Sequence, residues 1–591
     1  MKLFKLLLAL ALIVFFYSCD KDYQPLTLQK DLTNKIDALV LQVDSLKQAV
    51  ELNEPEKQIK KQFQSCRFLY KKIEWAVEYF TPDPARFING PALDELEVDE
   101  NKFLPPAGFQ VIEELIFPKY ESTSKADLIR EILVLKNNLL QVKKHVEVVT
   151  ISPEYVIDAT RMEVYRVVTL GITGFDSPIA LQSISETKYS IESIGNTVKL
   201  LSLKSSANQD KLLQYITNSV LFCEKNENFN SFNRLDFIKN YLNPISRLLL
   251  EIKKENKIPN VVRNNAINPE ATTLFETNSF NVNAFIPSEE YRFSNEKAKL
   301  GEKLFYEQLL SQNNDRSCAS CHHPDKAFTD GLKTNISLKG KLLSRNTPTL
   351  TYAAFQNAQF WDMRQPDLEK QSLDVIQNKE EMHGNLANSI IKIKDSEVYK
   401  DLFSKAFPKN TKIEEWQLQN ALASYIRTLN KFNSKFDLYM QNKSKNFNEE
   451  EKLGFNLFAG KAKCATCHFI PLYNGTVPPI YRKTEQEVIG TPSNKNNKSI
   501  SPDLGRFNQY KMAQLKNAFK TPTIRNSEKT APYMHNGVFD TLEEVVDFYN
   551  KGGGIGHGYE VENQTLPSDS LNLTAKEQKA LIAFIKTLTD Q

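Results

Sequence analysis

A short motif that occurs twice in the second half of this 591-residue chain constrains its fold more than any other feature. Each copy begins with Lys-Leu-Gly, continues two residues later with Leu-Phe, and ends with Cys-x-x-Cys-His. The copies span residues 299–322 and 452–468. Such a repeat indicates that one structural unit is built twice. The stretch between the copies and the stretch after the second each have room for a domain of about 100–150 residues.

The Cys-x-x-Cys-His ending has the chemistry that a covalently bound c-type haem requires. Two thiols one helical turn apart can add to the vinyl groups of a porphyrin, and a His directly after the second thiol can reach its iron. A zinc site is disfavoured because the adjacent His would be a strained ligand, and a thioredoxin-like pair would not need the His. The sequence therefore predicts two covalent haems, with these attachment residues and iron ligands: Cys318, Cys321 and His322, then Cys464, Cys467 and His468.

The N-terminus has the pattern of an export signal. Lys2 and Lys5 precede an apolar run over residues 6–16, and Tyr17-Ser18-Cys19 resembles the cleavage box of bacterial lipoproteins. We expect a lipoprotein signal peptide over residues 1–19 with Cys19 lipidated. The alternatives are an ordinary secretory signal or a short anchor helix. Each places the mature protein in the periplasm or cell envelope, and the lipid would be its contact with a membrane.

Composition restricts the partners and the role of the remaining cysteines. Lys and Arg total 75 and Asp and Glu total 72, a net charge of +3, which argues against a nucleic-acid-binding protein. Cys66 and Cys223 are left once lipidation and haem attachment are assigned. A disulfide between them is permitted outside the cytoplasm, but two buried thiols are slightly favoured.

The first half of the chain is predicted to be a helical bundle. Apolar residues recur at spacings of three and four, and Pro55 ends that pattern: Leu28, Leu32, Ile36, Leu39, Val43, Leu46 and Val50. A polar stretch over residues 257–290, rich in Asn and Pro, marks a domain boundary. Residues 108–113 faintly resemble the Gly-x-His-x-x-Glu motif of imelysin-like proteins, with Gln110 in place of the His.

Several ordered strings then identify a family resemblance. They are Ser-Cys-Ala-Ser-Cys-His (317–322), Ala-Phe-Thr-Asp-Gly (327–331), Asn-Thr-Pro-Thr-Leu (346–350), Phe-Trp-Asp (360–362), Pro-Thr-Ile-Arg-Asn (522–526) and Ala-Pro-Tyr-Met-His-Asn-Gly (531–537). From about residue 285 to 590 the chain resembles the bacterial dihaem cytochrome c peroxidase and MauG family. The resemblance implies a mainly α fold. A helical domain of unknown role (20–280) would precede two cytochrome c-like haem domains (285–440 and 441–591).

The same resemblance implies roles for individual residues. In that family the first haem reacts with hydrogen peroxide and the second relays electrons. Glu381 matches the catalytic acid/base, Gln371 matches a glutamine of the peroxide pocket, and Trp361 matches the tryptophan between the haems. Proton transfer between the two peroxide oxygens needs such a carboxylate, and an orienting group beside it. The competing interpretations are a solvated helix face for Glu381 and Gln371 and plain core packing for Trp361.

Two further features concern the coordination of the irons. Residues 324–382 contain no His. We therefore expect a five-coordinate first haem that lacks the distal His of many relatives and needs no reductive activation. At the second haem, Tyr549 stands where relatives have Met or Tyr, and a helix over residues 541–550 would present it. Tyr549 is the candidate second ligand, and Met512 and Met534 are the alternatives.

A calcium ion between the haem domains is also implied, with Asn346, Thr530 and Pro532 matching its ligands. An ordinary turn is the alternative at these positions. The first functional hypothesis is reduction of hydrogen peroxide with electrons from a small cytochrome c or cupredoxin. The second is a MauG-like oxidase of a protein or small molecule. The third is a dihaem electron carrier without enzymatic activity. A homodimer is left open.

Overall fold

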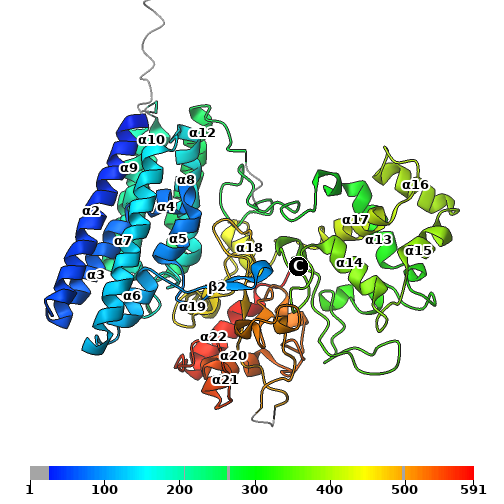
Figure 1. Cartoon of the computed structure of the whole chain (residues 1–591). Helices are drawn as coiled ribbons and strands as arrows, with labels where there is room; N and C mark the ends of the chain where they lie inside the picture. The colour runs from blue at the N-terminus through cyan, green and yellow to red at the C-terminus, as the bar shows by residue number, and fades with distance from the viewer. Residues whose placement is uncertain (1–24, 202, 205, 263–265, 496–498) are drawn as a thin grey trace, which may run out of the picture.

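The protein is mainly α-helical, as predicted (Figure 1). The computed structural model describes residues 25–201, 203–204, 206–262, 266–495 and 499–591, so the predicted signal peptide and Cys19 lie outside the described residues. Within these ranges no helix combines the length and the apolar character needed to cross a membrane.

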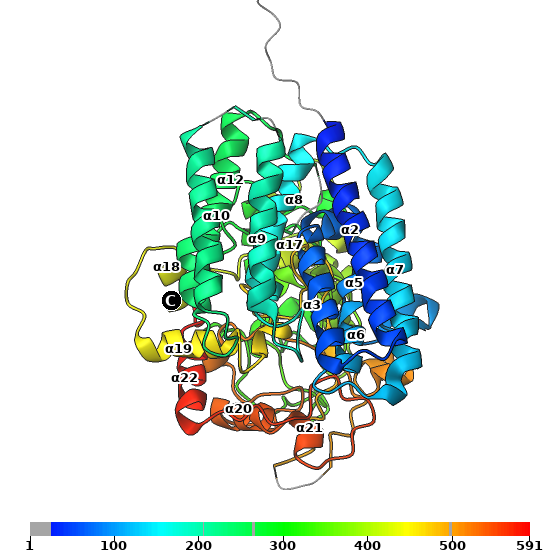
Figure 2. The same ribbon diagram turned by 90° about the vertical axis from the view of Figure 1, so that its left-hand side faces the viewer.

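The N-terminal half is a helical bundle, seen from its outer side in Figure 2. The predicted apolar stripe lies on α2 (Pro25–Glu51), where Leu28, Leu32 and Ile36 are at most 1% exposed. The chain turns at Pro55 into α3 (Glu56–Lys71), as expected of a residue that lacks a backbone donor. The remaining helices of this half are α4 (Glu74–Phe80), α5 (Pro82–Asn89), α6 (Phe109–Ile116), α7 (Lys125–Val148), α8 (Pro153–Arg166), α9 (Ser183–Leu200), α10 (Ala207–Lys225), α11 (Arg234–Phe237) and α12 (Asn243–Glu255). Cys66 and Cys223 are buried free thiols, which confirms the favoured prediction.

The C-terminal half contains the two predicted haem domains. The first has α13 (Asn295–Phe305), α14 (Leu368–Gln377), α15 (Leu386–Ile393), α16 (Glu397–Ala406) and α17 (Glu415–Ile426). α18 (Lys435–Met440) follows along the chain. The second haem domain has α19 (Glu449–Phe458), α20 (Leu542–Asn550), α21 (Gly553–Gly556) and α22 (Ala575–Lys586). Short antiparallel pairs are formed by β1 (Glu95–Glu97) with β2 (Lys102–Leu104), and by β3 (Gln486–Glu487) with β4 (Phe519–Lys520).

The glycine repeated in the two motifs lies where helices cross closely. Gly301 lies on α13 against α17, and a Cβ built there would come within 1.8 Å of the Ala421 carbonyl oxygen. Gly454 lies on α19 against α22 in the same arrangement, with 2.0 Å to the Ala580 oxygen. Contacts this short are impossible for a real Cβ, so only glycine allows these approaches. The repeat in the sequence therefore corresponds to a repeated helix crossing, in which the helix before each Cys-x-x-Cys-His segment packs against a helix that comes after it.

Replacing this glycine should destabilise the haem half. We expect Gly454→Ala to lower the free energy of unfolding by about 1–3 kcal/mol, because α19 and α22 must move apart to admit the methyl group. Gly171→Ala is the matched control, since its Cβ would meet its nearest atom at 3.7 Å, an ordinary contact. Denaturant titration of both variants checks this, and equal stability of the two would show that the crossing can relax.

Buried apolar side chains form two main cores. One belongs to the first haem domain and runs from Leu300 to Ile426. The other joins the bundle, from Leu28 onward, with the second haem domain as far as Leu588. The arrangement of the helices in Figure 1 agrees with this division. The bundle lies next to α19 and α22, whereas α13 to α17 lie on the opposite side of the molecule from the bundle.

The bundle contacts the second haem domain close to its Cys-x-x-Cys-His segment. Asn456 on α19 accepts a hydrogen bond from the Leu235 backbone N–H at 3.0 Å and donates one to Asn233 at 3.1 Å. Lys463, directly before the first cysteine, donates to the Pro178 carbonyl at 3.3 Å. The N-terminal domain therefore borders the second haem site.

Candidate haem sites

The first Cys-x-x-Cys-His segment forms one tight helical turn that orients His322. The turn spans Cys318–Ser320, and the His322 backbone N–H donates to the Cys318 carbonyl at 3.0 Å. His322 Nδ1 lies 2.8 Å from the Phe328 carbonyl oxygen. A carbonyl only accepts, so Nδ1 carries the proton and Nε2 is left as an unprotonated metal ligand. Burial lowers the pKa of His322, which also favours the neutral ring.

The second segment repeats this arrangement. Its turn spans Cys464–Thr466, and His468 Nδ1 lies 3.0 Å from the Pro522 carbonyl oxygen. Burial lowers the pKa of His468 to about 4, so this imidazole is neutral as well. The carbonyl partner comes from the Pro-Thr-Ile-Arg-Asn string, far along the chain from the histidine that it orients.

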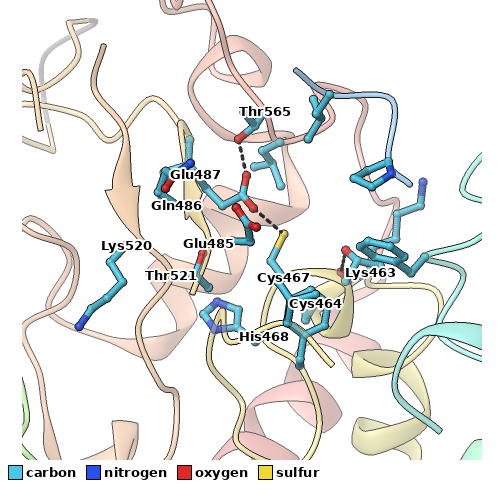
Figure 3. Close-up of a pocket in the computed structure, with 18 of the residues that line it drawn as sticks. Lys463, Cys464, Cys467, His468, Glu485, Gln486, Glu487, Lys520, Thr521 and Thr565 are labelled. Atoms are coloured by element: carbon cyan, nitrogen blue, oxygen red, sulfur yellow. Dashed lines mark hydrogen bonds between the residues drawn. The ribbon is translucent and has the colours of Figure 1, made fainter. Parts of the chain in front are cut away.

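A cavity of about 1520 Å³ opens beside the second segment. Its lining includes Cys464, Cys467 and His468 (Figure 3). Two thiols, a neutral imidazole whose Nδ1 is bound to a carbonyl so that Nε2 is free, and a large cavity with mostly apolar walls suit a covalently attached porphyrin. The residues present therefore fit a c-type haem.

Glu487 is a buried residue of this site that sequence reasoning missed. Its carboxylate accepts from the Thr565 hydroxyl and lies 3.5 Å from Cys467 Sγ, as Figure 3 shows. Burial raises the pKa of Glu487 to about 7. It lies on the short strand β3, paired with β4, and no motif in the sequence marks it. Only the pairing of these two strands brings it to the haem attachment site.

Tyr549 lies in the wall of the same cavity. It projects from α20, whose N-terminus has the predicted capping box between Thr541 and Glu544. Burial raises the pKa of Tyr549, and the nearby thiols of Cys467 and Cys464 raise it further. The phenol therefore lies near the second haem attachment site, as the ligand hypothesis requires, and its coordination to iron stays a prediction.

Glu381 lies near the first haem attachment site. Its carboxylate accepts from the Asn378 side chain at 3.0 Å, and it interacts electrostatically with Cys321. Burial raises the pKa of Glu381, while the Arg364 guanidinium opposes that shift. Glu381 is thus not a solvated helix face. Gln371 is half-buried on α14, the helix that ends four residues before Glu381.

Trp361 lies at the seam between the two haem domains. Its indole N–H donates to the Asn346 carbonyl at 2.9 Å, within the first domain. Its own carbonyl accepts from the Lys520 backbone N–H at 2.8 Å, on β4 of the second domain. Arg345 joins the same seam through Asp362, at 2.6 Å, and Asp503, at 2.7 Å. Trp361 is therefore fixed by both domains, beyond plain core packing.

The three predicted calcium ligands line the same cavity. Asn346, Thr530 and Pro532 all belong to its wall. The Asn346 amide donates to the Leu332 carbonyl at 2.9 Å, so its side-chain oxygen is the atom left to accept or to bind a cation. The calcium site itself stays a prediction.

The chain is similar to several known proteins. A model of the family described as "Di-haem cytochrome c peroxidase" matches residues 295–445. "Cytochrome-c peroxidase IdrP2" of Denitromonas iodatirespirans is 32% identical over 311 residues, which cover 50% of this chain and 81% of that protein. "Methylamine utilization protein MauG" of Methylophilus methylotrophus is 32% identical over 301 residues, which cover 50% and 82%.

Among solved structures, a "MauG-like protein associated with microbial copper homeostasis" is 29% identical, with a TM-score of 0.47. The match covers 52% of this chain and 94% of that one. The family match over residues 295–445 does not include the imelysin-like segment, whose resemblance stays untested. From the sequence identity, the matched length and the paired Cys-x-x-Cys-His segments, the chain belongs to the dihaem cytochrome c peroxidase and MauG family, and it is an oxidoreductase of the peroxidase type.

Proposed function

We propose that this protein reduces hydrogen peroxide to water with electrons from a small cytochrome c or cupredoxin. The observation that carries the proposal is the placement of Glu381, a half-buried carboxyl with a raised pKa beside Cys321 of the first haem attachment site. When bound there by Cys318, Cys321 and His322, the haem supplies the redox centre at which peroxide is reduced.

Glu381 serves as the proton carrier in this proposal. As a carboxylate it accepts the proton from one peroxide oxygen, and as a carboxylic acid it returns that proton to the departing oxygen. Each peroxide takes up two electrons and two protons and yields two water molecules. The raised pKa suits both steps, because it brings the acid and base forms closer in energy near neutral pH. Gln371 would orient the peroxide oxygens.

Trp361 gives electrons a route between the two haem domains. Its hydrogen bonds reach Asn346 on one side and Lys520 on the other, which holds an aromatic ring across the seam. Electrons would enter at the second haem, held by Cys464, Cys467 and His468, and pass toward the first.

Steady-state turnover tests the proposal. We expect the matured dihaem protein to consume hydrogen peroxide continuously with reduced small cytochrome c or reduced cupredoxin, oxidising two donor molecules per peroxide. The absorbance of the donor measures its oxidation, and a peroxide electrode measures the consumption of hydrogen peroxide. Absence of any peroxide reaction would contradict the proposal and would favour the electron carrier.

Tyr549 favours a second candidate, a MauG-like oxidase of a protein or small molecule. A phenolate ligand stabilises ferric iron, which suits storage of oxidising equivalents more than easy electron uptake. The proximity of Tyr549 to Cys467 and Cys464 supports this role. Slow peroxide decay without donor turnover, with oxidation of a second substrate, would distinguish this activity from the first.

Removing the Tyr549 hydroxyl should change the second haem alone. We expect Tyr549→Phe to shift the optical spectrum of that haem and to raise its reduction potential, because a ligand that favours ferric iron is lost. Potentiometric titration followed by absorbance measures both effects. Tyr559→Phe, in the segment after the same helix, is the control. An unchanged spectrum and potential in Tyr549→Phe would remove Tyr549 from the ligand set.

The remaining proposals follow from the sequence patterns. We propose a location in the periplasm or cell envelope, with Cys19 lipidated, on the basis of the signal pattern over residues 1–19. We also propose a calcium ion held by Asn346, Thr530 and Pro532, supported by their shared place in one cavity wall.

A further inference from the structure

A loop of the N-terminal bundle forms part of the wall of the cavity beside the second haem site. The loop spans residues 174–181 and lies between α8 and α9. Its side chains Phe175, Pro178 and Ile179 line the cavity together with the second Cys-x-x-Cys-His segment. Residues from the first half of the sequence therefore face the place where a covalent haem fits.

The loop also contacts that segment directly, at both of its ends. The Pro178 carbonyl accepts a hydrogen bond at 3.3 Å from Lys463, which lies directly before the first cysteine (Figure 3). The Phe175 ring packs edge-on against Phe469, which lies directly after the histidine, with the ring centroids 5.9 Å apart. The position of the loop is thus coupled to the residues that flank the haem attachment site.

Glu113 on α6 holds the loop from the bundle side. It is fully buried, and one of its carboxyl oxygens, Oε1, accepts from three donors of the loop. These are the backbone N–H groups of Ile179, at 2.9 Å, and Ala180, at 2.6 Å, and the Ser177 hydroxyl, at 3.3 Å. Loss of this acceptor would leave backbone donors unsatisfied, which is unfavourable. Glu113 is also the last residue of the imelysin-like stretch, so the structure gives that stretch a local role.

A buried ionic network holds the same loop at Asp176. The Asp176 carboxylate is fully buried and accepts from Lys71 and from Arg166, each at 2.6 Å. Arg67 donates to the Asp176 backbone carbonyl at 2.9 Å. Removing one partner of a buried charge pair is strongly unfavourable, so these contacts fix the loop against α3 and α8. The cavity wall is therefore anchored by three helices of the bundle.

We infer that residues 174–181 are a wall of the second haem pocket, that Glu113 is the positioning residue that keeps this wall in place, and that the N-terminal bundle thereby sets the reduction potential of the second haem. Solvent exposure and the polarity of the surroundings are among the factors that determine the potential of a haem. A closed apolar wall disfavours the ferric state, because that state carries one more positive charge. The inference concerns the second haem itself and does not depend on the substrate of the enzyme.

Potentiometric titration of the matured dihaem protein, followed by absorbance, tests this inference. Glu113→Ala removes the acceptor of the loop and should let water reach the second haem. We expect the equilibrium of that haem to shift about tenfold toward ferric iron, which corresponds to a potential lower by about 59 mV. Phe175→Ala, which removes the ring against Phe469, should shift it in the same direction. The potential of the first haem should not change in either variant.

Two further variants separate this role from a general loss of stability. Glu113→Gln keeps a side-chain oxygen that can accept from the same N–H groups, so it should retain the potential of the unaltered protein. Glu131→Ala is the matched control. Glu131 lies on α7, is 9% exposed and pairs with Arg130 on its own helix at 3.3 Å. Its loss should leave both haem potentials unchanged.

Hydrogen exchange gives a readout of the loop itself. In Glu113→Ala the amides of Ile179 and Ala180 should exchange faster than in the unaltered protein, because their hydrogen bonds are lost. Unchanged exchange would contradict the role of Glu113, as would a shift in Glu113→Gln as large as that in Glu113→Ala. Faster exchange without a lower potential would show that the loop is not a wall of the haem pocket.

The absorption bands of both haems report whether each variant is folded. If Glu113→Ala does not fold, Phe175→Ala decides the question, because Phe175 is only half-buried and its replacement leaves the hydrogen bonds of the loop in place. An unchanged second-haem potential in Phe175→Ala would then overturn the inference. Because peroxide turnover is measured separately, that result leaves the proposed peroxidase function intact.

Discussion

Glu381→Gln is expected to slow peroxide reduction by about 10²- to 10⁴-fold, because an amide cannot carry a proton between the two oxygens. Stopped-flow mixing of the matured protein with hydrogen peroxide measures the rate constant directly. Glu380→Gln is the control. Glu380 is adjacent in sequence, but its side chain is 53% exposed and lies 3.8 Å from Lys339. A loss of less than tenfold in Glu381→Gln would show that another group moves the proton.

The pH profile gives this prediction a second readout. Burial raises the pKa of Glu381 above its ordinary value, so the carboxylate is lost as pH falls through that raised pKa. The rate should therefore fall on the acid side at a higher pH than an unperturbed glutamate, with a pKa of about 4.3, would cause. That acid limb should be absent from Glu381→Gln. Ionisation of a carboxyl with a raised pKa costs stability as pH increases, so the amide variant should be at least as stable at neutral pH.

Asp437→Asn should lower the free energy of unfolding by about 3–5 kcal/mol, because it leaves a buried guanidinium without its counter-charge. Arg525 is fully buried and donates to both carboxylate oxygens of Asp437 at 2.9 Å. It also donates to the Pro471 carbonyl at 2.8 Å and lies over the Tyr352 ring. The pair ties α18 to the loop that follows His468.

Denaturant unfolding of the two variants checks the prediction. The control is Asp547→Asn, whose pair with Lys551 is about half exposed and should contribute only about 0–1 kcal/mol. Equal losses in the two variants would mean that the buried pair contributes no more than a surface pair. Haem absorbance should follow the unfolding of Asp437→Asn, since the loop beside His468 is anchored by this pair.

The motifs that carry chemistry could be predicted because local spacing alone defines them. The two Cys-x-x-Cys-His segments, the capping box at Thr541 and the stripe on α2 depend on residues a few positions apart. The repeated glycines were visible too, although their partners Ala421 and Ala580 were not. A helix crossing joins segments that are far apart in the sequence, and no periodic pattern links such segments.

Contacts between segments far apart in the sequence could not be predicted for the same reason. Glu487 reaches Cys467 only through the pairing of β3 with β4. Arg234 is buried, and no carboxylate among the described residues pairs with it. It donates to the carbonyls of Ile172 and Phe229 and lies against Gly460. No pattern in the sequence distinguishes a buried arginine of this kind from one that is exposed to solvent.

The shared core of the bundle and the second haem domain has a consequence for cooperativity. Apolar side chains from α2 to α12 and from α18 to α22 belong to one cluster, whereas α13 to α17 enclose their own. Two halves of a single core cannot melt independently, because either one alone would expose the face that the other covers. Although the sequence predicts three domains, we therefore expect the molecule to unfold as two cooperative units. The N-terminal bundle is as much a part of the second unit as α19, α20 and α22, which contribute to the same core.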